Sequence, residues 1–215
     1  MATAVGKQFP DLNVDAMNEM GDTFKINVLE EAKNNNKKVL LFWYPKDFTF
    51  VCPTELHAFQ AALGEFEKRN TIVIGASCDT PEVHFAWLST SKDNGGIEGV
   101  TYPLLADSNR NLSSVLGILD ITNETFDEAT QTIQVEGDNV TYRATYIIDE
   151  EGVVQHESIN NMTLGRNVRE HLRLVDALTH VQEKGEVCPA NWEEGKDAMK
   201  ADSKSTAEYL AAHMN

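Results

Sequence analysis

The longest uninterrupted run of apolar residues covers residues 39–44 and ends at Pro45. A run without polar alternation predicts a strand buried on both faces, and the proline stops it. A helix that begins near Cys52 is predicted next, because apolar residues recur there at helical spacing: Leu56, Phe59, Leu63 and Phe66. Residues 72–77 form a second candidate for a buried strand. Strand, helix and strand make a βαβ unit, whose two strands we expect to be parallel.

The second half of the chain predicts a hairpin followed by a long helix. Residues 142–149 and 153–159 are both strand-like, and a short turn that contains Gly152 links them. An amphipathic helical pattern then begins at Val168 and ends near Gly185. With short helices between the two halves, the order is βαβ followed by ββα. This order predicts an α/β fold with a mixed central sheet flanked by helices.

Two segments lack a regular pattern. Residues 118–140 carry six acidic side chains and no Lys or Arg, which predicts an irregular, solvated excursion between a helix and a strand. The tail after Gly185 holds mixed charges and Trp192, a residue usually found buried. We therefore expect a main domain over residues 1–184, and over residues 185–215 a C-terminal arm rather than a second domain.

The composition narrows the possible partners. The 215 residues include 18 Lys and Arg against 34 Asp and Glu, a formal net charge of −16. Phosphate backbones and anionic lipids repel such a chain, so neither nucleic acid nor a membrane surface is an expected partner. The six-residue apolar run is too short to cross a bilayer, and residues 1–7 contain no signal-peptide core. We expect a soluble, cytoplasmic protein.

The cysteines provide the candidate chemistry. They are Cys52, Cys78 and Cys188, with no Cys-x-x-Cys pair, and the six histidines show no metal-ligand spacing. No glycine-rich phosphate loop or dinucleotide fingerprint occurs, so the sequence predicts neither a metal nor a redox cofactor. Cys78 ends a predicted buried strand, where a thiol is usually inert packing.

Cys52 occupies the predicted first turn of a helix, where unpaired backbone N–H groups and the helix dipole favour a thiolate. The dipole contributes about 0.3–1 kcal/mol. Lowering the pKa of a thiol from about 8.5 to about 6 requires about 3.4 kcal/mol. A nearby cation is therefore expected, from Lys46 or Arg143, and the Thr49 hydroxyl is a candidate hydrogen-bond donor. The alternative is that Cys52 is a small buried hydrophobe, the commoner fate of a free cysteine.

The segment around Cys52 resembles the active-site segment of typical two-cysteine peroxiredoxins. Their Pro-x-x-x-Thr-x-x-Cys pattern is met by Pro45, Thr49 and Cys52. Three further segments, which run from residue 142 to residue 192, are similar to stretches of the same family: residues 142–149, 165–167 and 185–192. Because these motifs follow in the family's order, the resemblance covers nearly the whole chain. The segment 118–140 departs from the family pattern in being longer.

The resemblance implies a thioredoxin-like fold and a set of roles around Cys52. Cys52 would be the peroxidatic thiolate that attacks the peroxide O–O bond. Thr49 and Arg143 would orient and polarise the peroxide, and Pro45 would shield the sulfenic acid that forms. Glu55 would orient Arg143.

The resemblance also implies a second thiol and an external source of electrons. Cys188 would be the resolving thiol donated by a partner subunit, and Arg166 would extend the arginine network. The expected substrates are hydrogen peroxide and organic hydroperoxides. Thioredoxin or a flavoprotein disulfide reductase would supply electrons, and a homodimer, assembled as five dimers in a decamer, would be the working form. The closest subgroup is the bacterial alkyl hydroperoxide reductase C or thioredoxin peroxidase branch.

Two other functions remain open at this point. A thioredoxin-type disulfide reductase would share the fold, but it requires a Cys-x-x-Cys pair that the sequence lacks. An oligomeric chaperone, or a peroxide sensor that relays oxidation to partner proteins, would use the same cysteines as a peroxidase.

Overall fold

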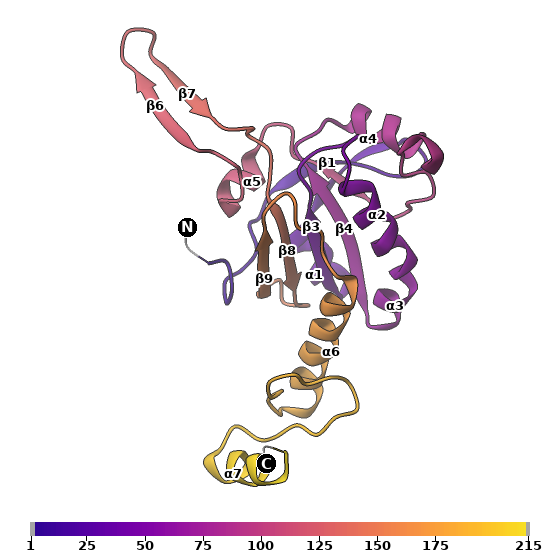
Figure 1. The fold of residues 1–215 in the computed structure, drawn as a ribbon, viewed down its shortest axis with the longest axis vertical. Helices are drawn as coiled ribbons and strands as arrows, with labels where there is room; N and C mark the ends of the chain where they lie inside the picture. The colour runs from indigo at the N-terminus through magenta and orange to yellow at the C-terminus, as the bar shows by residue number, and fades with distance from the viewer. Residues whose placement is uncertain (1–2, 214–215) are drawn as a thin grey trace. The chain divides into compact units, whose positions relative to one another are not determined.

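The computed structural model describes residues 3–213, which fall into two compact units. The first unit ends at Arg166 and the second begins at Asn167. Within the described residues, the β-strands all lie in the first unit, and the second unit contains two helices. Among the described residues, no helix combines the length and the apolar character needed to cross a membrane. Figure 1 traces the chain through the elements of both units.

Seven strands of the first unit form one mixed sheet, in the order β2-β1-β5-β4-β3-β8-β9. The strands are β1 (Asn13–Met17), β2 (Thr23–Asn27), β3 (Lys38–Trp43), β4 (Thr71–Ser77), β5 (Leu104–Ala106), β8 (Arg143–Ile148) and β9 (Val154–Asn160). β4 runs parallel to both β3 and β5, and the other pairs are antiparallel. The predicted mixed sheet is confirmed, as are the parallel pair around the helix and the β8–β9 hairpin.

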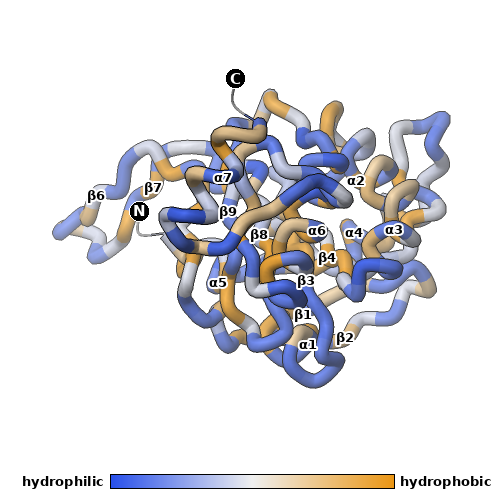
Figure 2. The backbone as a smooth tube through the Cα atoms, turned by 90° about the horizontal axis from the view of Figure 1, so that it is seen from below, coloured by the Kyte–Doolittle hydropathy of each residue, from blue (hydrophilic) through white to orange (hydrophobic). Residues whose placement is uncertain are grey.

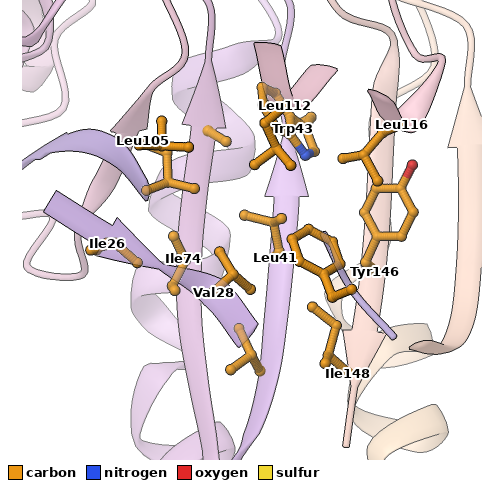
Figure 3. Close-up of a cluster of buried hydrophobic side chains, with 14 of the residues drawn as sticks. Ile26, Val28, Leu41, Trp43, Ile74, Leu105, Leu112, Leu116, Tyr146 and Ile148 are labelled. Atoms are coloured by element: carbon orange, nitrogen blue, oxygen red, sulfur yellow. The ribbon is translucent and has the colours of Figure 1, made fainter. Parts of the chain in front are cut away.

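One face of the sheet packs on α1 (Val28–Asn35) and α5 (Asn111–Leu116). Leu41 and Trp43 of β3 belong to a buried cluster with Ile74 of β4, Leu112 of α5 and Tyr146 of β8 (Figure 3). β3 is fully buried along its length because it lies between β4 and β8 in the sheet and helices cover both faces of the sheet.

The other face packs on α2 (Cys52–Ala61), α3 (Leu63–Lys68) and α4 (Pro81–Leu88). Phe42 of β3 stacks on Phe59 of α2 with ring centroids 4.1 Å apart, and Tyr44 contacts Trp87 of α4. Figure 2 shows hydrophobic residues gathered along the central strands and hydrophilic residues along most connections. The predicted helix after Cys52 is present, but it breaks at Ala62 into two helices.

The prediction of irregular structure over residues 118–140 was wrong. This segment forms an antiparallel hairpin of β6 (Asn123–Asp127) and β7 (Thr132–Glu136), which extends away from the sheet of the same unit (Figure 1). Alternation places Phe126 and Ile133 opposite each other, and both are exposed. The expected solvation is therefore present, but the backbone groups pair with each other as strands.

The second unit contains α6 (Val168–Lys184) and α7 (Ser203–His213). α6 begins after Asn167, whose side chain accepts a hydrogen bond from the Arg169 N–H, and it ends at Gly185 in the left-handed conformation. The predicted end of this helix is confirmed. The tail beyond it includes α7, a helix that the sequence pattern did not predict.

Candidate active site

Cys52 is the first residue of α2, reached from the end of β3 through the loop of residues 44–51. Pro53 follows it in the first turn, and no side chain caps this helix end. Pro53 suits the position because it has no N–H to leave unpaired and its φ fits a helix. Cys52 is 0% exposed. The sequence thus places a buried thiol at the positive end of a helix.

Two polar side chains contact the thiol. The Thr49 hydroxyl oxygen lies 2.9 Å from the Cys52 sulfur and 2.9 Å from the Lys46 carbonyl oxygen. A hydroxyl has one proton, so it can donate to only one of these acceptors at a time. A guanidinium nitrogen of Arg143 donates to the same sulfur at 3.4 Å. Both donors therefore favour a negative charge on sulfur.

Glu55, one turn after Cys52 on α2, holds two arginines. Its carboxylate accepts hydrogen bonds from Arg143 at 2.6 Å and from the Arg166 guanidinium at 2.8 and 3.0 Å. Arg143 also donates to the Met162 carbonyl at 2.7 Å, and Arg166 donates to the Trp43 carbonyl at 2.8 Å. All three charged side chains are at most 4% exposed. The position of Arg143 beside sulfur is therefore fixed by at least two other bonds.

The charges of this cluster balance only when the thiol is ionised. Arg143 and Arg166 contribute two positive charges, and Glu55 contributes one negative charge. A protonated Cys52 leaves one excess positive charge in a buried site, which is costly. A Cys52 thiolate cancels it. Burial lowers the pKa of Arg166 from its ordinary value, and the charge and hydrogen bonds of Glu55 oppose that shift.

Asp47 holds the loop that carries Thr49 through hydrogen bonds to Tyr44, Asp79 and His84. This buried carboxylate lies 2.7 Å from Nδ1 of His84, on α4, and accepts a hydrogen bond from the Tyr44 hydroxyl at 2.8 Å. The Asp47 N–H donates to Asp79 at 2.9 Å. Burial acts to lower the pKa of His84, but the hydrogen bond and charge of Asp47 outweigh it and raise that pKa. For the Asp47 carboxyl, burial has the opposite effect and raises the pKa, although the hydrogen bond and charge of His84 act to lower it.

A pocket of about 430 Å³ lies above the thiol. Thr49 and Arg143, which both contact the Cys52 sulfur, line it, so the buried sulfur lies directly behind this wall. The other lining residues are Pro45, Lys46, Phe50, Val51, Asp138, Val140, Met162 and Thr163. The volume is within the range of small-molecule sites and exceeds what hydrogen peroxide alone needs.

The structure brings together most of the residues singled out from the sequence. Cys52, Thr49, Glu55 and Arg143 form one cluster, and Pro45 lines the pocket above it. Of the two candidate cations, Arg143 contacts the sulfur. The Lys46 side chain is exposed, and within residues 3–213 the side-chain hydrogen bonds to the sulfur come from Thr49 and Arg143.

The other two cysteines have different surroundings. Burial raises the pKa of Cys78 to about 11, so this thiol is protonated at neutral pH, in agreement with a packing role. Cys188 belongs to the second unit, where its thiol donates to the Ala177 carbonyl at 3.7 Å. Burial raises the pKa of Cys188 as well.

Several residues of the site were not predicted. Asp47 and His84 are charged or polar residues in a loop and a short helix, and their pairing across 37 positions has no local signal. Asp138 and Val140 come from the base of the β6–β7 hairpin. Over residues 3–213 the structure contains no group of three or more His, Cys, Asp or Glu side chains that could hold a metal ion.

Comparisons with known proteins agree on one family. The model of the AhpC/TSA family matches residues 5–157, and that of the C-terminal domain of 1-Cys peroxiredoxin matches residues 177–212. Alkyl hydroperoxide reductase C of Helicobacter pylori is 41% identical over 96% of this chain and 96% of its own. The chloroplastic 2-Cys peroxiredoxin BAS1 of Hordeum vulgare is 40% identical over 97% and 90%, respectively. The crystal structure of the reduced 2-Cys peroxiredoxin of Plasmodium vivax superimposes with a TM-score of 0.85, at 38% identity, and covers 98% of this chain and all of that one.

Proposed function

Since the chain belongs to the AhpC/TSA family of peroxiredoxins, which are thiol-dependent peroxidases, we propose that Cys52 is its peroxide-reducing thiol. The thiolate attacks one peroxide oxygen, so that an S–O bond forms while the O–O bond breaks. Cys52 becomes a sulfenic acid, and the other oxygen leaves as hydroxide or alkoxide, which takes a proton from solvent to give water or an alcohol. The substrates are hydrogen peroxide and organic hydroperoxides.

The observation that carries this proposal is the pair of donors on the Cys52 sulfur. Arg143 and Thr49 both line the pocket and both reach the atom that would attack. A bound peroxide can therefore accept hydrogen bonds from the same groups while negative charge develops on its leaving oxygen. Glu55 holds Arg143 in this position, which avoids reorganisation during the reaction. Pro45 forms part of the pocket wall and would restrict water near the sulfenic acid.

We assign the resolving role to Cys188 of a partner subunit. Its thiolate would attack the sulfur of the Cys52 sulfenic acid, form a disulfide and release water. A dithiol donor would then supply two electrons and two protons and restore both thiols. Thioredoxin and a flavoprotein disulfide reductase are the two candidate donors. Two relatives are named 2-Cys peroxiredoxin, which supports the use of a second cysteine.

The proposal includes an assembly and a place of action. The resolving step in trans requires at least a homodimer, and a decamer of five dimers is the expected ring. A cytoplasmic location is proposed because three free thiols suit a reducing compartment. The alternative, a peroxide sensor or oligomeric chaperone, uses the same sulfur and differs in the rate of peroxide turnover.

A coupled assay and an electrophoresis experiment test the proposal together. With a dithiol donor present, the protein should consume peroxide through many turnovers, and Cys52→Ser should abolish consumption. After one equivalent of peroxide, a non-reducing gel should show a band at twice the monomer mass. That band should be lost in Cys52→Ser and in Cys188→Ser, but retained in Cys78→Ser. Peroxide consumption that persists in Cys52→Ser would overturn the assignment.

A further inference from the structure

The base of the β6–β7 hairpin forms part of the pocket above Cys52. Asp138 and Val140, the residues that follow β7, line the pocket together with Lys46 and Arg143. The longer 118–140 segment is therefore joined to the site where a hydroperoxide would bind. We propose that Asp138 is a specificity-determining residue, which makes the pocket select neutral alkyl hydroperoxides over those bearing a carboxylate. This inference rests on the proposed function.

Hydrogen bonds on both sides of Asp138 fix the hairpin base. The Thr122 N–H donates to the Glu136 carbonyl at 2.8 Å, and the Asp120 N–H donates to the Val140 carbonyl at 2.8 Å. Arg110 donates to the Asn139 carbonyl at 2.9 Å. Because these hydrogen bonds involve residues on both sides of Asp138, they fix the backbone at Asp138.

Gly137 adds a steric constraint at the same place. Its φ of 116° lies in a region that residues other than glycine rarely adopt. A Cβ atom at this position would lie 2.4 Å from the Asp120 carbonyl oxygen. The chain therefore turns sharply and close to Asp120 immediately before Asp138. Thr141, just beyond, is buried and donates to the Tyr44 carbonyl at 3.0 Å, which ties the segment to the end of β3.

The charges of the pocket explain the selectivity. Three residues with charged side chains line it: Lys46, Asp138 and Arg143. Glu55 and the Cys52 thiolate together balance the charges of Arg143 and Arg166. Within residues 3–213, neither Lys46 nor Asp138 forms an ion pair. Asp138 therefore offsets the attraction that Lys46 would exert on an anion. The remaining wall is largely apolar, with Phe50, Val51 and Val140 among its residues, and suits a neutral hydrocarbon chain.

The test compares a carboxylate-bearing alkyl hydroperoxide with its methyl ester, which lacks the charge and is larger by one methyl group; because each protein variant meets the same two substrates, the change in ratio between variants reports the charge. The readout is the ratio of their second-order rate constants for oxidation of Cys52. Asp138→Asn should raise the ratio of anionic to neutral substrate about threefold, and Asp138→Lys about tenfold. Lys46→Gln should lower it about threefold. These shifts should shrink at about 1 M salt, where the Debye length falls to about 3 Å.

Glu128→Gln, at the tip of the same hairpin, provides the matched control. It removes the same charge, but β7 spans about 14 Å at about 3.4 Å per residue, so this site lies beyond a Debye length from the pocket. Its ratio should equal that of the parent protein. A parental ratio in both Asp138 variants would overturn the inference while leaving the peroxidase assignment intact. If no hydroperoxide oxidises Cys52 rapidly in the parent protein, the proposed function itself fails.

Discussion

At the scale of single residues, the chemistry of Cys52 depends on one arginine that has several partners. Arg143 bonds the sulfur, the Glu55 carboxylate and the Met162 carbonyl through different N–H groups. A planar guanidinium can serve these directions together, whereas a lysine ammonium is a point charge on a flexible stem. The shape of the side chain is therefore as important here as its charge.

Arg143→Lys should accordingly lower kcat/KM for hydrogen peroxide by about a hundredfold, and Arg143→Gln by about a thousandfold or more. Peroxide consumption under steady-state conditions measures both. Arg69→Lys, at the end of α3, is the control and should retain the parental value. An Arg143→Lys enzyme with the parental kcat/KM would show that charge alone is enough.

The buried pair of His84 and Asp47 leads to a pH-dependent stability. Because the His84 pKa is raised in the folded protein, the folded state binds this proton more tightly than the unfolded state does. The resulting stability is fully present below the ordinary histidine pKa of about 6.5 and is lost as the pH rises through the raised value. The raised pKa of Asp47 also favours the protonated folded state, but its contribution is fully present only below the ordinary aspartate pKa of about 3.9 and declines as the pH rises from there.

His84→Gln should therefore reduce the free energy of unfolding by about 2 kcal/mol near pH 6, and by clearly less near pH 9. Urea unfolding at the two pH values measures the difference. A loss of the same size at both would mean that His84 stabilises the loop by packing rather than by its charge.

At the scale of elements, the first turn of α2 needs different conformations for the reaction with peroxide and for disulfide formation. In the helix it holds Cys52 at 0% exposure beside Arg143. A disulfide requires Cα atoms about 4.4–6.8 Å apart, which a cysteine packed in a helical turn does not usually allow. The proposed cycle therefore needs this turn to unwind whenever the Cys52–Cys188 disulfide forms.

Amide hydrogen exchange tests this unwinding. We expect the amides of Thr54 and Glu55 to lose protection in the disulfide form relative to the reduced form, because their hydrogen bonds to the Val51 carbonyl are broken. Amides of β3, which is buried along its length, should keep theirs and provide the control. Equal protection around Cys52 in the two forms would contradict the unwinding.

The elements also show why the sequence revealed some parts of the fold and concealed others. β3 and β8 are each six residues long and fully buried, and the apolar run of β3 and the strand-like composition of β8 were visible in the sequence. β5 has three residues, and three of the five residues of β2 are exposed, which leaves too little pattern. In the β6–β7 hairpin, the abundance of acidic residues concealed an alternation that places Phe126 and Ile133 on one face.

The same distinction applies to the site. Cys52, Thr49 and Pro45 lie within eight positions, so their spacing alone could be recognised. The bonds from Glu55 to Arg143 and Arg166 span 88 and 111 positions, and only the folded sheet brings them together. Before the structure was known, the resemblance to a family was what linked these residues. No motif in the sequence indicated that Asp138 lines the pocket.

At the scale of the whole molecule, the two thiols of the proposed cycle belong to different units. Cys52 lies in the unit that ends at Arg166, and Cys188 lies in the unit that begins at Asn167. The residues assigned to the first half of the cycle, oxidation of Cys52, all belong to the first unit. This first half can therefore be isolated by removing the resolving thiol.

Stopped-flow oxidation of Cys188→Ser by one equivalent of hydrogen peroxide tests the central claim most directly. We predict a single rapid turnover, at least about a hundredfold faster than a free thiol because charge is stabilised at the attacked peroxide. Mass spectrometry should then find one added oxygen atom on Cys52 and none on Cys78. A rate equal to that of free cysteine, or oxygen added first to Cys78, would contradict the account.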